Sequence, residues 1–269
     1  MKNNIFIIVP LLLLNACAND IERNITTNLQ VEANEIFKTS LALEESLRYV
    51  FLSFEEYQNA QTDSLPGCPT ILIDENEKKV ELQFTDNSNC PSQKLNRSGN
   101  LVLDFNTINL IDQEVLLSYE NYKIKDFEIK GNRRFTKSAS ISSSNLWQEN
   151  FMDLLIVDEF QNSTKISGSY DHRLEIINDT LISFTSSGNL EGRNITGRPL
   201  KMTQITPRLY QNVCIEEGQV IASSGVETWE IFRTPTRSLA HTLTFSSDST
   251  CVSKASLQLS DGRLIIFEQ

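Results

Sequence analysis

From residue 70 onward the chain is a succession of short segments in which apolar and polar residues alternate. The stretch 79–84 is one example, and similar segments recur at intervals of about ten residues as far as Phe267. A period of two places apolar side chains on one face of a strand and polar side chains on the other. Polar turns separate the segments, and short turns join antiparallel strands. The pattern therefore predicts a mainly β protein whose sheet has one buried and one wet face.

Many short antiparallel strands fit two architectures, an antiparallel sandwich of two sheets or one long curved sheet. The sequence leaves both open. A weak internal repeat indicates that the body consists of two similar segments, because a Leu-x-Phe strand end lies six residues before Cys90 and another lies six residues before Cys251. We expect the all-β body to occupy residues 65–269, with a candidate sub-division near residue 200.

One stretch before the strands has helical periodicity. Its apolar residues recur at steps of three, four and seven, which predicts one amphipathic helix over residues 31–60 that packs on the sheet. The acidic residues of this stretch are expected on the opposite, solvated side of the helix. They are Glu44, Glu45, Glu55 and Glu56.

The first seventeen residues resemble the leader of a bacterial lipoprotein. Lys2 precedes the apolar run Ile5–Leu14, and Ala16 stands directly before Cys17. A run of this length is far short of the roughly 20 apolar residues that cross a bilayer, so it is not a permanent span. Because the pattern resembles a lipobox, we expect residues 1–16 to be a cleaved signal peptide and Cys17 to be acylated. Residues 17–30 would be the lipid-attached tether, held by palmitate-like chains.

Two further features bear on location and partners. Ala18 after the lipid cysteine resembles a signal for the outer membrane, and Asp20 and Glu22 resemble an acidic export signal to the cell surface. We therefore expect a membrane-bound protein of the cell envelope, anchored at the outer membrane and facing either the periplasm or the outside. The net charge of −11 repels phosphate backbones, so nucleic acid is not an expected partner.

The body contains four cysteines besides Cys17, and an even number in an exported chain is typical of disulfides. Of the three possible connectivities we favour Cys68 with Cys90 and Cys214 with Cys251, because each pair closes a short loop within its own segment. Zinc is the competing interpretation. The chain has no Cys-x-x-Cys and no histidine near these cysteines, so we expect no metal and no cofactor.

These motifs together are similar to those of a group of uncharacterised β-rich outer-membrane lipoproteins from Bacteroidota-type bacteria. The resemblance rests on the lipobox, the acidic helix and the two cysteine pairs. It also rests on the motifs Cys68-Pro69-Thr70, Arg97-Ser98-Gly99 and Asp261-Gly262. The chain departs from the group by having Asn, Ser and Asp where glycines usually flank the second and last cysteines. The resemblance implies a β fold and no enzymatic activity.

Three Asp-Ser or Asp-Thr pairs in predicted turns resemble the acceptor motif of Bacteroidota O-glycosylation. Their hydroxyl residues are Ser64, Thr180 and Ser249.

Catalytic motifs are scarce. His172 and His241 are the only histidines, and no Gly-x-Ser-x-Gly elbow accompanies them, so we expect surface or strand-end positions for both. Trp147 and Trp229 lie in alternating contexts that favour the core. We therefore expect no enzyme and no catalytic residues.

The sequence favours a lipid-anchored envelope lipoprotein with a non-enzymatic structural or binding role. One alternative is a surface lipoprotein that binds or processes glycans in a groove floored by Trp147, Trp229 or Tyr170. Another is an accessory subunit of an envelope complex, docked through its acidic helix. The expected partners are accordingly the membrane through the N-terminal lipid, and an envelope protein or a glycan.

Overall fold

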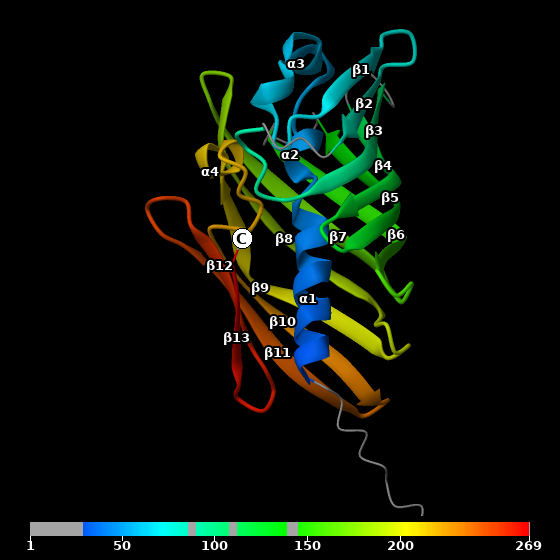
Figure 1. Ribbon diagram of the computed structural model, residues 1–269, viewed down its shortest axis with the longest axis vertical. Helices are drawn as coiled ribbons and strands as arrows, with labels where there is room; N and C mark the ends of the chain where they lie inside the picture. The colour runs from blue at the N-terminus through cyan, green and yellow to red at the C-terminus, as the bar shows by residue number, and fades with distance from the viewer. Residues whose placement is uncertain (1–28, 86–89, 108–111, 139–144, 269) are drawn as a thin grey trace, which may run out of the picture.

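The computed structural model describes residues 29–85, 90–107, 112–138 and 145–268. The predicted signal peptide, Cys17 and most of the predicted tether lie outside the described residues. Within them, thirteen strands form one sheet in which each strand pairs antiparallel with its neighbours in the chain (Figure 1). The strands are β1 (Thr70–Asp74), β2 (Lys79–Phe84), β3 (Arg97–Thr107), β4 (Asp112–Ile124), β5 (Phe127–Ser138), β6 (Leu146–Asp158), β7 (Ser163–Ile177), β8 (Thr180–Arg193), β9 (Pro199–Gln211), β10 (Ser224–Thr234), β11 (Arg237–Ser247), β12 (Ser253–Gln258) and β13 (Leu264–Glu268).

Of the two architectures that the sequence leaves open, the fold is the long curved sheet. Residue 200 lies inside β9, which pairs with β8 on one side and with β10 on the other, so the sheet continues through this point. The alternation predicted from the sequence is present along the strands. Along β6 and β7, for example, buried side chains alternate with exposed ones over most of the strand.

The predicted N-terminal helix is present, but it does not run unbroken over 31–60, because the segment is divided into several shorter helices. They are α1 (Leu29–Glu44), α2 (Leu47–Val50) and α3 (Phe54–Asn59), followed by η1 (Thr62–Ser64). The break after α1 places the buried Ser46 against Tyr119 of β4, with 2.9 Å between the hydroxyl oxygens. The start of α3 is fixed by a capping box, in which Ser53 and Glu56 bond each other's backbone N–H groups.

One further short helix, α4 (Asn212–Glu216), follows β9. No helix of the described part of the chain has the length and apolar character needed to span a bilayer.

The sheet curls around α1, which lies lengthwise on its concave side (Figure 1). Contacts from α1 and the turn after it reach strands far apart in the sheet. Phe37 stacks on Phe267 of β13, with 4.2 Å between ring centroids, and Glu35 accepts a hydrogen bond from Thr164 of β7. At the other end, Glu45 pairs with Arg97 of β3. The helix is therefore a central element of the core.

Glycines opposite aromatic residues let the sheet bend sharply in its middle. Phe151 of β6 pairs with Gly168 of β7, and Tyr170 of β7 pairs with Gly188 of β8. A Cβ atom on Gly168 would lie 2.8 Å from the Phe151 ring, and one on Gly188 would lie 2.5 Å from the Tyr170 ring. Each ring therefore occupies space that only glycine leaves free, as in other strongly curved sheets.

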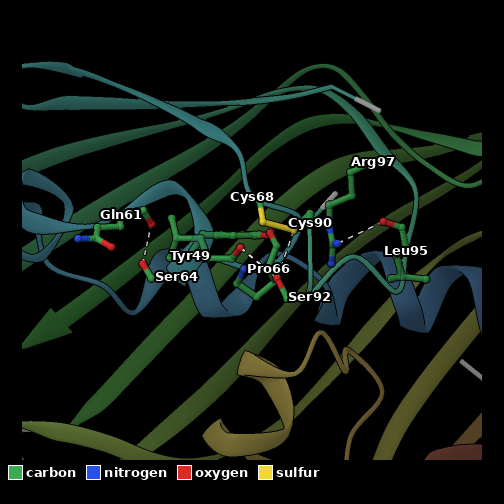
Figure 2. Close-up of a disulfide and its surroundings, with 10 residues drawn as sticks. Tyr49, Gln61, Ser64, Pro66, Cys68, Cys90, Ser92, Leu95 and Arg97 are labelled. Carbon is green, nitrogen blue, oxygen red and sulfur yellow. Dashed lines mark hydrogen bonds between the residues drawn. A yellow bond between two sulfur atoms is a disulfide. The ribbon is translucent and has the colours of Figure 1, made fainter. Parts of the chain in front are cut away.

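Two disulfides join Cys68 to Cys90 and Cys214 to Cys251, which is the pairing favoured from the sequence. Figure 2 shows the first of them beside Tyr49, whose hydroxyl donates a 2.6 Å hydrogen bond to the Pro66 carbonyl oxygen. This disulfide holds the segment entering β1 against the segment that leads into β3. It thereby fixes the first hairpin of the sheet next to the helical segment.

We expect the double substitution C68S/C90S to lower the free energy of unfolding by about 3–4 kcal/mol, because the open chain regains loop entropy when it unfolds. The double substitution C214S/C251S should cost a similar amount. Urea denaturation of oxidised wild type and both variants measures the effect. Equal midpoints for wild type and variants would contradict a stabilising role for these bonds.

Candidate functional site

Eleven charged or histidine side chains are buried between α1, the turn after it and the concave face of the sheet. We call this set the inner ionic cluster. Its members are Glu32, Glu35, Glu44, Glu45, Arg97, Arg133, Glu149, His172, Arg208, Glu227 and His241. An unpaired charge in such a place costs several kcal/mol, so the arrangement depends on how the members are paired.

The expectation that Glu44 and Glu45 face solvent is wrong. Both are at most 5% exposed, whereas Glu55 and Glu56 on α3 are exposed as expected. Glu45 accepts a 2.8 Å hydrogen bond from Arg97 Nε and another from the Tyr122 hydroxyl. The sheet therefore supplies the partners that allow this carboxylate to be buried.

Arg208 of β9 is shared by two carboxylates. Its Nη1 lies 2.9 Å from Glu44 Oε1, and its Nη2 pairs with Glu227 of β10. Glu44 also accepts hydrogen bonds from the Ser40 hydroxyl and the Ala222 backbone N–H. Burial raises the pKa of Glu44 to about 7; the positive charge of Arg208 opposes this rise, and the negative charge of Glu227 adds to it. Arg208 has one positive charge for two buried carboxylates, so it does not neutralise both. Glu44 therefore tends to hold a proton.

Four neighbouring strands, β8 to β5, contribute a hydrogen-bonded chain that ends on Arg133. Ser186 Oγ lies 2.7 Å from His172 Nδ1, and His172 Nε2 lies 2.8 Å from Glu149 Oε2. The other oxygen of Glu149 accepts a 2.6 Å hydrogen bond from Arg133 Nε. Although burial raises the pKa of Glu149, the charges and hydrogen bonds of Arg133 and His172 bring it down to about 2.

Ser186, His172 and Glu149 are hydrogen-bonded in the same succession as a catalytic triad, but the ring nitrogens they use and their burial differ. The serine bonds Nδ1 and the carboxylate bonds Nε2, which is opposite to the serine protease arrangement. All three residues are 1% exposed, and the Phe51 ring lies 5.4 Å from the imidazole. A substrate therefore has no path to Ser186 in this structure.

The N-terminal half of α1 is paired in the same way. Glu32 accepts a 2.7 Å hydrogen bond from Arg233 Nη2, and His241 Nε2 and Arg198 Nη1 lie 3.5 and 3.6 Å from its carboxylate oxygens. Burial raises the pKa of Glu32, but His241 and Arg233 outweigh it and lower the pKa overall. Both histidines are 1% exposed, so the expected surface or strand-end positions are wrong for them.

The inner ionic cluster leaves little space for a ligand. A cavity of about 10 Å³ beside Glu44 and Arg97 has room for no more than a single water. No group of three or more metal-ligating side chains is suitably placed in the described ranges. The arrangement therefore holds α1 and the turn after it in the sheet.

The remaining predicted site residues are spread over the surface or the core. Ser64, Thr180 and Ser249 are all exposed, so their hydroxyl groups are accessible to a modifying enzyme. Cys17 lies outside the described residues.

Trp147, Trp229 and Tyr170 are at most 7% exposed and belong to the core. This confirms the core position that the sequence predicts for the two tryptophans. Trp147 and Trp229 therefore do not floor a sugar-binding groove. Tyr170 borders a hollow on the outer face of the sheet, but its ring has too little exposed surface to stack on a sugar. This corrects the aromatic form of the glycan alternative.

Comparison of this chain with protein-family models, curated proteins and solved structures finds no match. The interpretation of the site rests on its own chemistry.

We expect wild-type stability to fall as the pH rises from about 4.5 to 7. The folded pKa of Glu44, about 7, lies above the ordinary value of 4.5, so the folded state holds this proton more tightly. The loss is about 3 kcal/mol. Glu149 acts in the opposite direction, because its stabilisation is present above pH 4.5 and is lost as the pH falls towards 2.

The substitution Glu44→Gln should remove most of the decline between pH 5 and 7, since the neutral amide keeps the shape of the protonated acid. Urea denaturation at several pH values measures this slope. Glu55→Gln, at an exposed glutamate, is the matched control and should keep the wild-type slope. A wild-type slope in E44Q would show that Glu44 does not carry the effect.

Proposed function

We propose that this chain is a lipid-anchored envelope protein with a non-enzymatic binding role. The leader resembling a lipobox supports the anchor, and the cysteine pairs are consistent with an oxidising compartment outside the cytoplasm. The family resemblance described from the sequence belongs to the same proposal. The protein would be attached to the outer membrane through Cys17.

The short separation between Cys17 and α1 also supports the proposed anchor. The first described helix, α1, begins at Leu29, twelve positions after Cys17. This helix and the turn after it are held in the sheet by buried ion pairs, such as Glu32 with Arg233 and Glu45 with Arg97. A lipid on Cys17 would therefore be joined through a short segment to the central element of the core, so the anchor would hold the folded sheet directly.

The non-enzymatic part of the proposal is supported by the state of the buried nucleophile. Ser186 is 1% exposed, and the histidine it bonds lies next to the Phe51 ring. That histidine is already engaged with Glu149, which is itself paired with Arg133. Such a chain rigidifies the sheet, because each polar group is satisfied only in one arrangement.

The anchor is tested by replacing Cys17 with alanine in the native host. Wild type should enter the detergent phase of a Triton X-114 separation, and C17A should move to the aqueous phase because it lacks acyl chains. Asn19→Ala is the control and should partition like wild type. Mass spectrometry that finds an unacylated wild-type N-terminus would overturn the anchor.

The absence of hydrolase chemistry is tested with a fluorophosphonate probe, which labels activated serines. We expect no labelling of the native protein and no difference between wild type and Ser186→Ala. Labelling that disappears in S186A would contradict the proposal, since it would show that Ser186 is both reachable and activated.

A further inference from the structure

The outer face of the sheet is hollowed across β6 to β9, on the side opposite to α1. The hollow, which we call the outer groove, has a volume of about 560 Å³. Its lining is polar along each strand. The lining side chains at exposed positions are Gln148, Asn150, Ser169, Asp171, Ser187, Asn189 and Thr203.

Irregular pairing between β8 and β9 accounts for one wall. The pairs Ser186 with Arg208 and Asn189 with Thr203 enclose two residues of β8 but four of β9. The two extra residues within 204–207 make β9 arch away from β8. Bulges of this kind bend a strand and change its twist, which gives a local concavity on the outer face.

The groove belongs to a longer row of uncharged polar residues that crosses seven strands, which we call the outer ladder. Cross-strand pairing places its members side by side, so neighbouring members are separated by the inter-strand distance of about 4.8 Å. The members, in order from β6 to β12, are Asn150, Ser169, Asn189, Thr203, Thr228, Thr242 and Gln258.

The side chains of the outer ladder are available to a ligand. Asn150, Ser169, Asn189 and Thr203 make no side-chain hydrogen bond to another described residue. Hydroxyl and carboxamide groups both donate and accept, so together they match a ligand whose own groups do both. Sugar hydroxyls are of this kind, and a chain of sugars repeats them at a spacing similar to that between strands.

The charge of the outer groove argues for a neutral ligand. The two charged residues of its lining, Asp171 and the buried Glu149, are both negative, and the chain has a net charge of −11. An anionic polymer would be repelled. An apolar peptide would leave these polar groups without partners.

We propose that the outer groove binds an extended, uncharged glycan chain that lies across the strands along the outer ladder. The proposal deepens the binding role proposed above and rests on it, by assigning that role to one surface and naming its ligand class. Binding relies on hydrogen bonds to hydroxyl groups, because Tyr170, the one aromatic residue in the lining of the outer groove, is 4% exposed and offers no open ring face.

The test uses the full chain, purified in detergent, and isothermal titration with neutral hexasaccharides. The probes are maltohexaose, cellohexaose, laminarihexaose and xylohexaose, with a hexamer of galacturonic acid as the charged comparison. We expect at least one neutral hexasaccharide to bind, and its disaccharide to bind more weakly because it contacts fewer strands. The charged hexamer should not bind.

The double variant N150A/N189A should weaken this binding about tenfold, since two hydrogen-bonding side chains are lost. The matched control N76A/N132A removes two exposed asparagines outside the outer groove and should bind like wild type. Circular dichroism should be the same for both variants.

Three results would overturn the proposal: no binding of any neutral hexasaccharide, an equal loss in both double variants, or binding of the charged hexamer alone. The lipid state of Cys17 is measured on the same preparation by mass spectrometry. An unacylated protein that binds a hexasaccharide would refute only the anchor, and an acylated protein that binds none would refute only the glycan site.

Discussion

The fold depends on ion pairs between α1, the turn after it and the sheet. Glu32, Glu44 and Glu45 are buried against arginines on β10, β9 and β3. Each residue of an α-helix is rotated by about 100° from the last, so a slip of α1 by one residue would turn these carboxylates away from their partners. An unpaired buried charge costs several kcal/mol, so the pairs specify a single position for the helix.

The strand register that the buried ion pairs require also determines which residues lie next to one another on the outer face of the sheet. Side chains on a strand alternate between the two faces, so the register that aligns Glu149 with its partners also aligns the residues on either side of it. His172 and Ser186 are buried on the inner face, and their neighbours Asp171 and Ser187 line the outer groove. The inner ionic cluster and the outer ladder are therefore two faces of one set of strand pairings.

Local signals in the sequence predicted the strands and the disulfide pairing, because a period of two and a short loop between cysteines are properties of neighbouring residues. The break between α2 and α3 also had a local signal, since Ser53 and Glu56 have the spacing of a capping box. The burial of Glu44 and His172 had none. Their partners, Arg208 and Glu149, are brought to them only by the curl of the sheet.

The sequence by itself determined that the chain is mainly β, that a helical segment precedes the strands, and which cysteines pair. These features follow from side-chain periodicity and from short separations along the chain. Tertiary structure alone decided that the strands form one sheet curled around α1, and that acidic helix residues lie in its core. The reason is that the stability of a buried charge depends on a partner distant in sequence, and no pattern within either segment records that partner.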